Sequence, residues 1–273
     1  MTLTINGKSW TFDMAGRTGA ITIREVVRIH GDDCDVVILN GFQTADDIPL
    51  RDGDCIALIK KGAMPPPGML DTMMRARHTP GVHDAVRAST VGIAGLGGLG
   101  SNVAAMLARV GVGRLVIADF DVVEPSNLNR QNYYVSHLGM MKSAATKELL
   151  AQINPYTKVE ARAERVTAEN AKEVFGECAV VCEAFDNPAQ KAMLANAVLL
   201  RMPGVKLVAA SGMAGFGSAN RIQTRRAMKN FYLCGDSDSE AMPGNGLMAP
   251  RVMVCAAHQA SMALRLLLGE VEP

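Results

Sequence analysis

The sequence predicts an α/β chain in which a doubly wound, mostly parallel sheet follows a small domain of strands and one helix. Three observations support this fold class. From residue 90 onward, short apolar runs typical of buried strands alternate with helical segments. The first sixty residues instead contain short alternating runs and a hairpin signal. A proline-rich segment at residues 62–68 separates the two regions.

The first region is predicted to be a compact unit of four strands and one helix. Its strand-like runs lie at residues 3–5, 10–12, 35–41 and 55–59. Asn6-Gly7 joins the first two runs as a tight turn. Thr22 can cap a helix over residues 23–30, with Glu25 at the capping-box position. The order strand, strand, helix, strand, strand is that of a β-grasp unit, which we place at residues 1–62.

The segment GAMPPPG, residues 62–68, favours an extended backbone, because successive prolines exclude a helix. We therefore predict a domain boundary here. A proline-rich linker and N-terminal arm are expected over residues 63–88, and the second domain over residues 89–273.

The second domain alternates apolar strand-like runs with helices. The runs lie at residues 91–95, 115–119, 179–185 and 206–211. Helices are expected from the first run to Gly111, near residues 142–153 and near residues 188–201. This alternation predicts a doubly wound, Rossmann-like sheet.

Composition and charge limit the partners. Lys and Arg total 28 against 27 Asp and Glu, so the net charge of +1 gives no overall electrostatic reason to expect a nucleic acid or an acidic membrane. The polar N-terminus and the lack of an unbroken run of about 20 apolar residues predict a cytoplasmic protein without a membrane partner. The six cysteines, mostly in apolar surroundings, are expected to be reduced thiols.

A glycine-rich loop follows the first strand of the second domain and opens a helix, which is the context of a phosphate-binding loop. Its residues are Gly95, Gly97, Gly98, Gly100 and Ser101. Glycines let the backbone approach a phosphate closely, while free amides and the helix dipole offer donors and partial positive charge. The loop alone does not separate a dinucleotide from ATP, and a tight turn without a ligand is the alternative.

Polar residues continue beyond the next strand. Asp119 and Asp121 close that strand, about 19 residues after Gly100, where a carboxylate can bind a ribose. Further polar and basic side chains follow at Asn127, Arg130, Gln131 and Lys142. Their donors suit a polyphosphate with more negative charge than NAD carries. In the alternative interpretation, Arg130 and Lys142 are solvated surface charges and Asn127 is a turn residue.

The third strand of the second domain ends at Asp186, in the place where ligands of open sheets bind. Mg²⁺ usually takes one or two carboxylates plus substrate phosphates, so this side chain could hold the ion. Its alternative role is to cap the helix that begins at Pro188.

Several spaced motifs together resemble one family. GxGGLGS, DFDxVxxSNLxRQ, a downstream Lys and AFDN occur in the order found in the ThiF/MoeB/HesA family of the ubiquitin-activating-enzyme-like superfamily. The resemblance covers residues 90–269 and extends to clostridial-type ThiF proteins with a fused N-terminal ThiS-like domain. It implies an ATP-dependent adenylyltransferase.

The resemblance also assigns roles. ATP would lie across the glycine loop, Asp119 would bind the ribose, and Asp186 would place Mg²⁺. Residues implied to line the phosphates are Asn127, Arg130, Gln131 and Lys142. The family typically forms homodimers in which an arginine enters the partner's ATP site; Arg77 is the best match and Arg75 its rival.

The implied reaction joins the C-terminal glycine carboxylate of a separate ThiS-like sulfur carrier to AMP and releases pyrophosphate. Thiamine thiazole biosynthesis is the expected pathway. Two alternatives stay open: an NAD-dependent oxidoreductase, and a non-catalytic ATP-binding regulatory module occupied by its own β-grasp domain.

The sequence departs from the family in its cysteines. Many relatives hold a structural zinc with two CxxC pairs, but this chain has neither, so we expect no zinc. Cys178 and Cys182 are expected to be core residues. Residues 236–246, where some relatives carry a reactive cysteine, contain none, which leaves Cys234 as the nearest candidate. His258 is expected to be a hydrogen-bonded packing residue.

The ThiS-like unit differs from a carrier at its carboxyl end. Gly62 runs directly into Ala63, so the unit has no free terminal carboxylate to adenylate. We therefore expect a docking, regulatory or dimer-supporting domain, with a separate carrier as the substrate.

Overall fold

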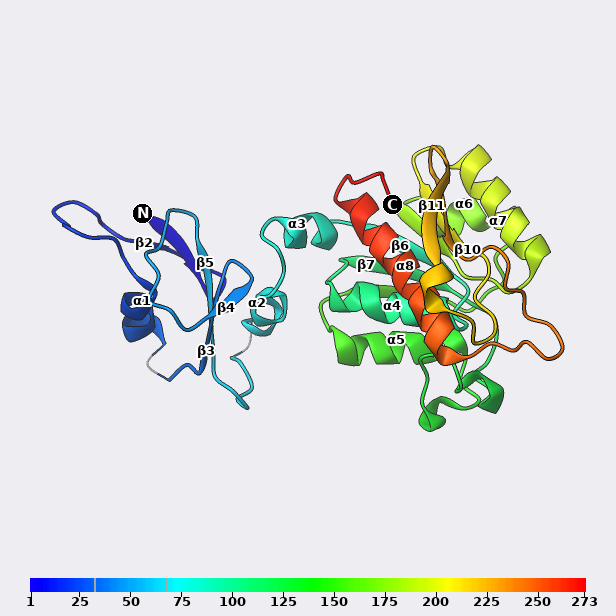
Figure 1. Ribbon diagram of the computed structural model, residues 1–273, viewed down its shortest axis with the longest axis horizontal. Helices are drawn as coiled ribbons and strands as arrows, with labels where there is room; N and C mark the ends of the chain where they lie inside the picture. Colours follow the sequence, from blue (N-terminus) through cyan, green and yellow to red (C-terminus); the bar gives the residue numbers. More distant parts are fainter. Residues whose placement is uncertain (32, 67) are drawn as a thin grey trace. The chain divides into compact units, whose positions relative to one another are not determined.

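The computed structural model describes residues 1–31, 33–66 and 68–273, which form two compact units, Met1–His83 and Asp84–Pro273 (Figure 1). Pro67, part of the predicted linker, lies outside the described residues. Within the described ranges, no helix is both long enough and apolar enough to cross a lipid bilayer.

The first unit is a five-stranded sheet with one helix on it, in the strand order β2-β1-β5-β3-β4. Its elements are β1 (Thr2–Ile5), β2 (Lys8–Thr11), α1 (Ile23–His30), β3 (Val36–Leu39), β4 (Phe42–Thr44) and β5 (Cys55–Ile59). The central strands β1 and β5 are parallel, and the other neighbours are antiparallel. Helix α1 buries Ile23 and Val26 in the same core as Leu3 and Leu58 of the sheet. The β-grasp prediction is confirmed.

Two details of the first unit differ from the sequence prediction. Strand β4 was not predicted, because three residues are too few to show an alternating pattern. Thr22 occupies the N-cap position of α1, as predicted, but the expected capping hydrogen bond is wrong: its side chain makes none with the described residues. Glu25 instead pairs with Arg17, whose Nη2 lies 2.7 Å from Glu25 Oε2.

Two short helices occupy part of the stretch for which a linker and arm were predicted. They are α2 (Leu70–Arg75), which belongs to the first unit, and α3 (Val82–Arg87). Helix α2 packs against β5.

The second unit is a seven-stranded sheet in the order β11-β12-β10-β9-β6-β7-β8. Its strands are β6 (Thr90–Ala94), β7 (Arg114–Ala118), β8 (Lys158–Arg162), β9 (Val180–Glu183), β10 (Lys206–Ala210), β11 (Gln223–Met228) and β12 (Phe231–Gly235). All neighbours are parallel except β11 and β12.

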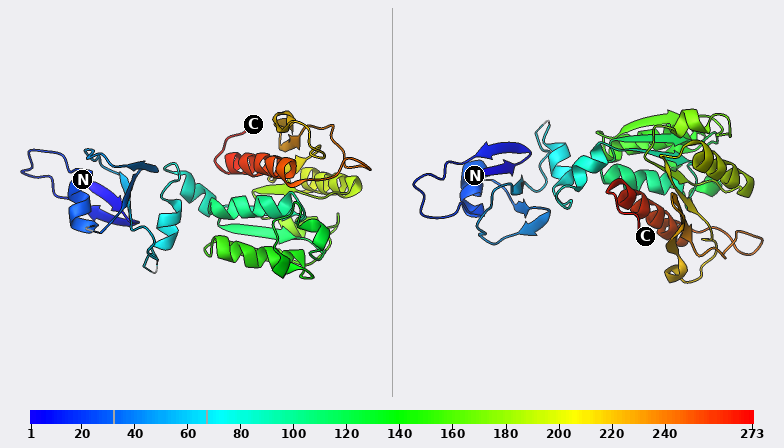
Figure 2. Two further views of the ribbon diagram at one scale, coloured as in Figure 1. Left: turned by 60° about the horizontal axis from the view of Figure 1, so that its bottom comes forward. Right: turned by 90° about the horizontal axis from the view of Figure 1, so that it is seen from above.

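Helices cover both faces of this sheet. They are α4 (Gly100–Arg109), α5 (Lys142–Ile153), α6 (Ala171–Phe175), α7 (Pro188–Arg201) and α8 (Ala249–Leu267). Helices α4, α5 and α8 pack side by side on one face, and α6 and α7 pack together on the other (Figures 1 and 2). The doubly wound, mostly parallel sheet is confirmed.

The strand order creates the place for a site. From β6 the chain proceeds outward to β7 and β8, and it then crosses back to β9 on the other side of β6. The loops after β6 and β9 therefore leave the sheet in opposite directions and open a crevice at its carboxyl edge. The glycine loop follows β6, and Asp186 follows β9.

Candidate functional site

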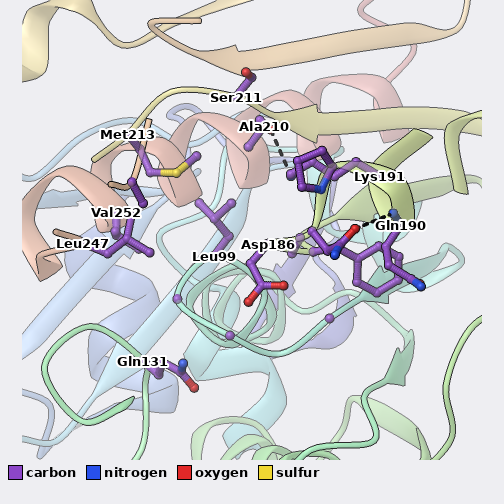
Figure 3. Close-up of a pocket in the computed structure, with 18 of the residues that line it drawn as sticks. Leu99, Gln131, Asp186, Gln190, Lys191, Ala210, Ser211, Met213, Leu247 and Val252 are labelled. Carbon is purple, nitrogen blue, oxygen red and sulfur yellow. Dashed lines mark hydrogen bonds between the residues drawn. The ribbon is translucent and has the colours of Figure 1, made fainter. Parts of the chain in front are cut away.

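A pocket of about 860 Å³ lies at this carboxyl edge, with residues from the loops after six of the seven strands around it (Figure 3). Nine predicted site residues line it: Gly95, Gly97, Gly98, Asp119, Asp121, Arg130, Gln131, Lys142 and Asp186. Three further predicted residues, Gly100, Ser101 and Asn127, lie behind this lining within the described part of the unit.

The glycine loop needs glycine for steric reasons. Gly95 has φ +90°, a conformation that L side chains rarely adopt. A Cβ atom on Gly100 would overlap the carbonyl oxygen of Gly95. Ser101 fixes the start of α4, because its hydroxyl donates to the Gly97 carbonyl (2.7 Å) and accepts from the Asn132 amide (3.0 Å).

Asp119 shapes the loop as well as the pocket. One carboxylate oxygen accepts from the Leu96 amide at 2.6 Å, and the other accepts from the Asp121 amide at 2.8 Å. Burial raises the pKa of Asp119, although both amides favour its charged form. Each carboxylate oxygen can accept a further hydrogen bond, so Asp119 can also bind a ligand hydroxyl.

Two cations and an amide stand beside the glycine loop. Lys142 Nζ lies 3.1 Å from Asp121 Oδ2, and its side chain is only 9% exposed. Arg130 Nη1 donates to the Ser126 carbonyl (3.0 Å) and to Asn129 Oδ1 (2.8 Å). The Oε1 atom of Gln131 is buried and has no hydrogen-bond partner among the described residues. These groups can interact with an anionic, hydroxyl-rich ligand.

Asn127 serves the backbone. Its Oδ1 accepts from the Glu124 amide at 3.0 Å and thereby caps the short 3₁₀ turn Pro125–Asn127. The side chain is buried, and it does not reach the pocket surface. This is the turn role that the sequence left open, and it supports Arg130 three residues later.

Asp186 is exposed at the pocket, between Leu99 and Gln190 in Figure 3. Asn187 caps α7 instead, since its Oδ1 accepts from the amides of Ala189 (2.9 Å) and Gln190 (3.2 Å). The capping role considered for Asp186 is therefore wrong, and its carboxylate is available to a ligand.

The pocket fits Mg²⁺ only as an ion shared with a ligand. No three His, Cys, Asp or Glu side chains in the described ranges converge in a way that could hold a metal. Asp186 can supply one carboxylate, which matches the habit of Mg²⁺ to take its remaining ligands from phosphates and water.

Sequence reasoning missed an ion pair at the pocket. Lys191 Nζ lies 3.1 and 3.0 Å from the two carboxylate oxygens of Glu183, and it also donates to the Ala210 carbonyl at 3.1 Å. The last of these hydrogen bonds is drawn in Figure 3. Lys191 thus ties the end of β9 to the end of β10. No motif marked it, because its partners come from two separate strands.

The lining after β10 and β12 was also missed. It comprises Ser211, Gly212, Met213, Ala214, Ser237, Asp238, Ser239, Glu240, Ala241 and Leu247. None of these residues was among the predicted site residues, and strand β12, which precedes the second segment, was not predicted.

Comparison with known proteins decides the family. The ThiF family model matches residues 72–273, and the ThiS-like ubiquitin model matches residues 1–62. The chain belongs to the ThiF family. It is 36% identical to the Sulfur carrier protein ThiS adenylyltransferase of Escherichia coli over 191 residues, which cover 68% of this chain and 74% of that protein.

Other relatives are longer. The Adenylyltransferase and sulfurtransferase UBA4 of Lodderomyces elongisporus is 30% identical over 190 residues, covering 67% of this chain but only 41% of the relative. The chain therefore spans less than half the length of this relative.

Solved structures share the fold. The E. coli tRNA N6-threonylcarbamoyladenosine dehydratase TcdA in complex with ATP aligns with TM-score 0.65 and 22% identity, over 72% of this chain and 93% of that one. E. coli MccB with ATP aligns with TM-score 0.56 and 22% identity, over 70% and 59%. At this identity the likeness shows the ThiF-type fold alone.

The remaining candidates of this ThiF-family chain are two arginines of the first unit. Arg77 follows α2 in the first unit and donates to Gln43 Oε1, and Arg75 donates to Thr72 Oγ1 at 3.4 Å. Both residues belong to the first unit, whereas the pocket belongs to the second.

The structure does not support a reactive thiol at Cys234. The residue lies inside β12 and is fully buried, and burial raises its pKa to about 11. A thiol of this kind is a poor nucleophile near neutral pH. Cys178 and Cys182 are buried core residues, as predicted. His258 Nδ1 lies 2.9 Å from Thr224 Oγ1, which is the hydrogen-bonded packing role expected for it.

Proposed function

We propose that this ThiF-family chain is an adenylyltransferase that activates the C-terminal glycine carboxylate of a separate ThiS-like sulfur carrier with ATP. One observation carries the proposal: the glycine loop, Arg130, Lys142 and Asp186 line a single pocket at the carboxyl edge of the sheet. The similarity to the E. coli protein named as a ThiS adenylyltransferase supports it.

The nucleotide would bind with its phosphates against the glycine loop and its ribose at Asp119. Amides near the start of α4 and the partial positive charge of that helix favour phosphate at this position. Arg130 and Lys142 supply positive charge from the segment after β7, and Gln131 offers an unpartnered oxygen to a hydroxyl or amine. Asn127 would act through the turn that carries Arg130.

The reaction needs positioning more than it needs a base. A carrier carboxylate oxygen attacks the α-phosphorus, the bond from that phosphorus to the bridging oxygen breaks, and pyrophosphate leaves with the electron pair. The nucleophile is already ionised, so no proton must be removed. Arg130 and Lys142 offset the charge that develops on the phosphates. Mg²⁺, when bound, would neutralise part of the same charge, and Asp186 would hold it.

Two finer assignments belong to the same proposal. We assign Arg77 to a partner's ATP site in a homodimer, with Arg75 as the alternative. The pathway would be thiamine thiazole biosynthesis. An NAD-dependent reaction would leave the cations at positions 130 and 142 without a role.

The test is ATP–pyrophosphate exchange with candidate carriers that end in Gly-Gly. We expect exchange that depends on the carrier and is fastest with the physiological one. ATP binding without carrier-dependent exchange would instead indicate a non-catalytic ATP-binding module. Binding of NADH that ATP does not displace would indicate the oxidoreductase.

Substitution of the two cations tests their roles. Lys142→Ala and Arg130→Ala should each lower the exchange rate about 100-fold or more, since each removes charge that stabilises the transition state. Circular dichroism should show that the fold is kept. Near-normal exchange in both variants would reject the assigned roles.

A further inference from the structure

Two irregular segments form one side of the pocket. They are residues 211–222 after β10 and residues 236–248 after β12, which we call the two-loop wall. Its pocket-lining members are Ser211, Gly212, Met213, Ala214, Ser237, Asp238, Ser239, Glu240, Ala241 and Leu247. Apart from one short 3₁₀ turn, Ala219–Arg221, neither segment has regular secondary structure to hold it.

A buried ion pair behind the wall joins its parts. Arg251 Nη2 lies 2.6 Å from Asp236 Oδ2, and the side chains are only 4% and 1% exposed. Arg251 Nη1 also donates to the Ser218 carbonyl at 2.7 Å. Because Arg251 lies in the first turn of α8, the pair connects both segments to the helix.

Asp236 organises the second segment. Its Oδ1 accepts from the amides of Asp238 (3.0 Å) and Ser239 (2.8 Å), and its Oδ2 accepts from the Ser239 hydroxyl. Burial opposes its charge, but the hydrogen bonds from Ser239, Asp238 and Arg251 outweigh that effect and hold the pKa of Asp236 well below its usual range. Asp236 thus fixes residues 237–239, which line the pocket, through hydrogen bonds on the side away from it.

The position of the two-loop wall indicates which reactant it contacts. The loops after β7 and β8 lie on the opposite side of β6 from the loops after β10 and β12. Asp119, the proposed ribose ligand, follows β7, and the glycine loop follows β6. When a nucleotide is held by those groups, the side of the pocket formed by the two-loop wall stays open for the second reactant.

We propose that Arg251 and Asp236 are positioning residues that hold the two-loop wall in the shape that receives the C-terminal segment of the carrier. This inference rests on the proposed adenylyltransferase function. A flexible tail loses conformational freedom when it binds, and a wall already in place reduces the further ordering that binding requires. Correct placement of the carboxylate against the α-phosphorus then favours the reaction.

Two variants loosen the wall in different ways. Arg251→Lys keeps a positive charge but cannot reach both Asp236 and Ser218 with a planar fork. Asn245→Ala removes the Nδ2 donor to the Glu240 carbonyl, which lies at 2.7 Å, and leaves no buried charge unpaired. Neither Arg251 nor Asn245 lines the pocket. If Arg251→Lys does not fold, Asn245→Ala still tests the inference.

The measurements separate carrier from nucleotide. Equilibrium dialysis with radiolabelled ATP gives the affinity for nucleotide without carrier, and pyrophosphate exchange at varied carrier concentration gives KM and kcat. We expect both variants to raise the KM for the carrier at least tenfold and to lower kcat, with ATP affinity within twofold of the unmodified protein.

Two controls accompany these variants. Arg221→Ala breaks a pair on the same wall, with Asp238 at 2.8 Å, whose side chains are 55% and 73% exposed, and it should leave the KM for the carrier unchanged. Val198→Ala removes packing from a fully buried site in α7 and serves as a destabilised control. It should lower the melting temperature without changing the KM for the carrier.

The outcomes distinguish the positioning role of Arg251 and Asp236 from the proposed function. An unchanged carrier KM in both wall variants, or an equal loss of ATP affinity, would overturn the positioning role while the proposed function stands. Absence of carrier-dependent exchange in the unmodified protein would overturn the proposed function and this inference together.

Discussion

The polar side chains at the pocket divide into two groups by what their atoms already bind. Asp119, Asn127 and Ser101 use their oxygens on backbone groups and so fix the loops that surround the pocket. Gln131 Oε1 binds no other group in the described part of the chain, and the Asp186 side chain is exposed at the pocket. The first group explains the shape of the pocket, and the second is available for a ligand. Residue type and spacing did not distinguish the groups, because the difference depends on where neighbouring amides point.

The cysteines give a prediction at the same scale. Burial raises the pKa of Cys234 to about 11, so in the folded protein at pH 8 only about one thiol in a thousand is ionised, and the buried sulfur is also shielded from reagents. Cys55, in contrast, is exposed. Iodoacetamide at pH 8 should modify Cys55 in the native protein and leave Cys234 unmodified, as measured by peptide mass spectrometry. Unfolding in urea should make both reactive.

A result against this expectation has a clear meaning. If Cys234 reacted in the native state as fast as Cys55, strand β12 would have to open readily, and a thiol intermediate at this position would return to consideration. The buried Cys182, whose pKa is also raised by burial, is the matched control for general opening of the sheet.

Among the elements, the arm after the ThiS-like sheet is the least expected. Helix α2 packs against β5, and Thr72 lies beside Gly7 of the first hairpin. Gly41 has φ +88°, and a Cβ atom there would lie 2.6 Å from the His78 carbonyl oxygen. Arg77 donates to Gln43 in β4. The arm is therefore attached to the ThiS-like unit at several points and is more than a spacer.

This attachment predicts the effect of Gly41→Ala. The new methyl group would displace the backbone at His78. The alanine would also have to keep a positive φ, which is unfavourable for a residue with a Cβ atom. Hydrogen exchange at residues 70–78 should become faster, and the first unit should lose about 1–3 kcal/mol of stability. Exchange in α4 should not change.

Gly16→Ala is the matched control for backbone strain. Gly16 has φ +79°, but a Cβ atom there meets nothing within 4 Å. It should cost about 1–2 kcal/mol without loosening the arm. Equal exchange at residues 70–78 in both variants would show that the contact with His78 does not hold the arm.

The elements also show how far sequence reasoning reached. The helices at 142–153 and 188–201 were predicted with their observed bounds, since Pro188 marks the start of the second one. Strands β8 and β11 were missed because they lie at the sheet edges, where KVEAR and QTRRAM lack an apolar pattern. The site followed the same division: residues after β6, β7 and β9 were predicted, whereas those after β10 and β12 were not.

For the molecule as a whole, the question is why an adenylating unit carries a carrier-like one. A carrier presents a free C-terminal carboxylate, but Gly62 is joined to Ala63 by a peptide bond, and the chain continues into the arm. An amide carbonyl is not a nucleophile of the required kind, so the fused unit cannot form the acyl-adenylate at this position. Its contacts with the arm favour a supporting role.

Intact-mass spectrometry can test whether the fused unit or a separate carrier is adenylated. The protein incubated with Mg-ATP alone should keep the mass of the uncleaved chain, and neither a fragment ending at Gly62 nor an added AMP should appear. A separate carrier ending in Gly-Gly should gain the mass of AMP when carrier and enzyme are mixed, before a sulfur donor is added. A cleaved product that ends at Gly62 and carries AMP would mean that the chain supplies its own carrier. The Ala63→Pro variant would then lose that product, because most proteases do not cleave the peptide bond that precedes a proline, while adenylation of the separate carrier should continue unchanged.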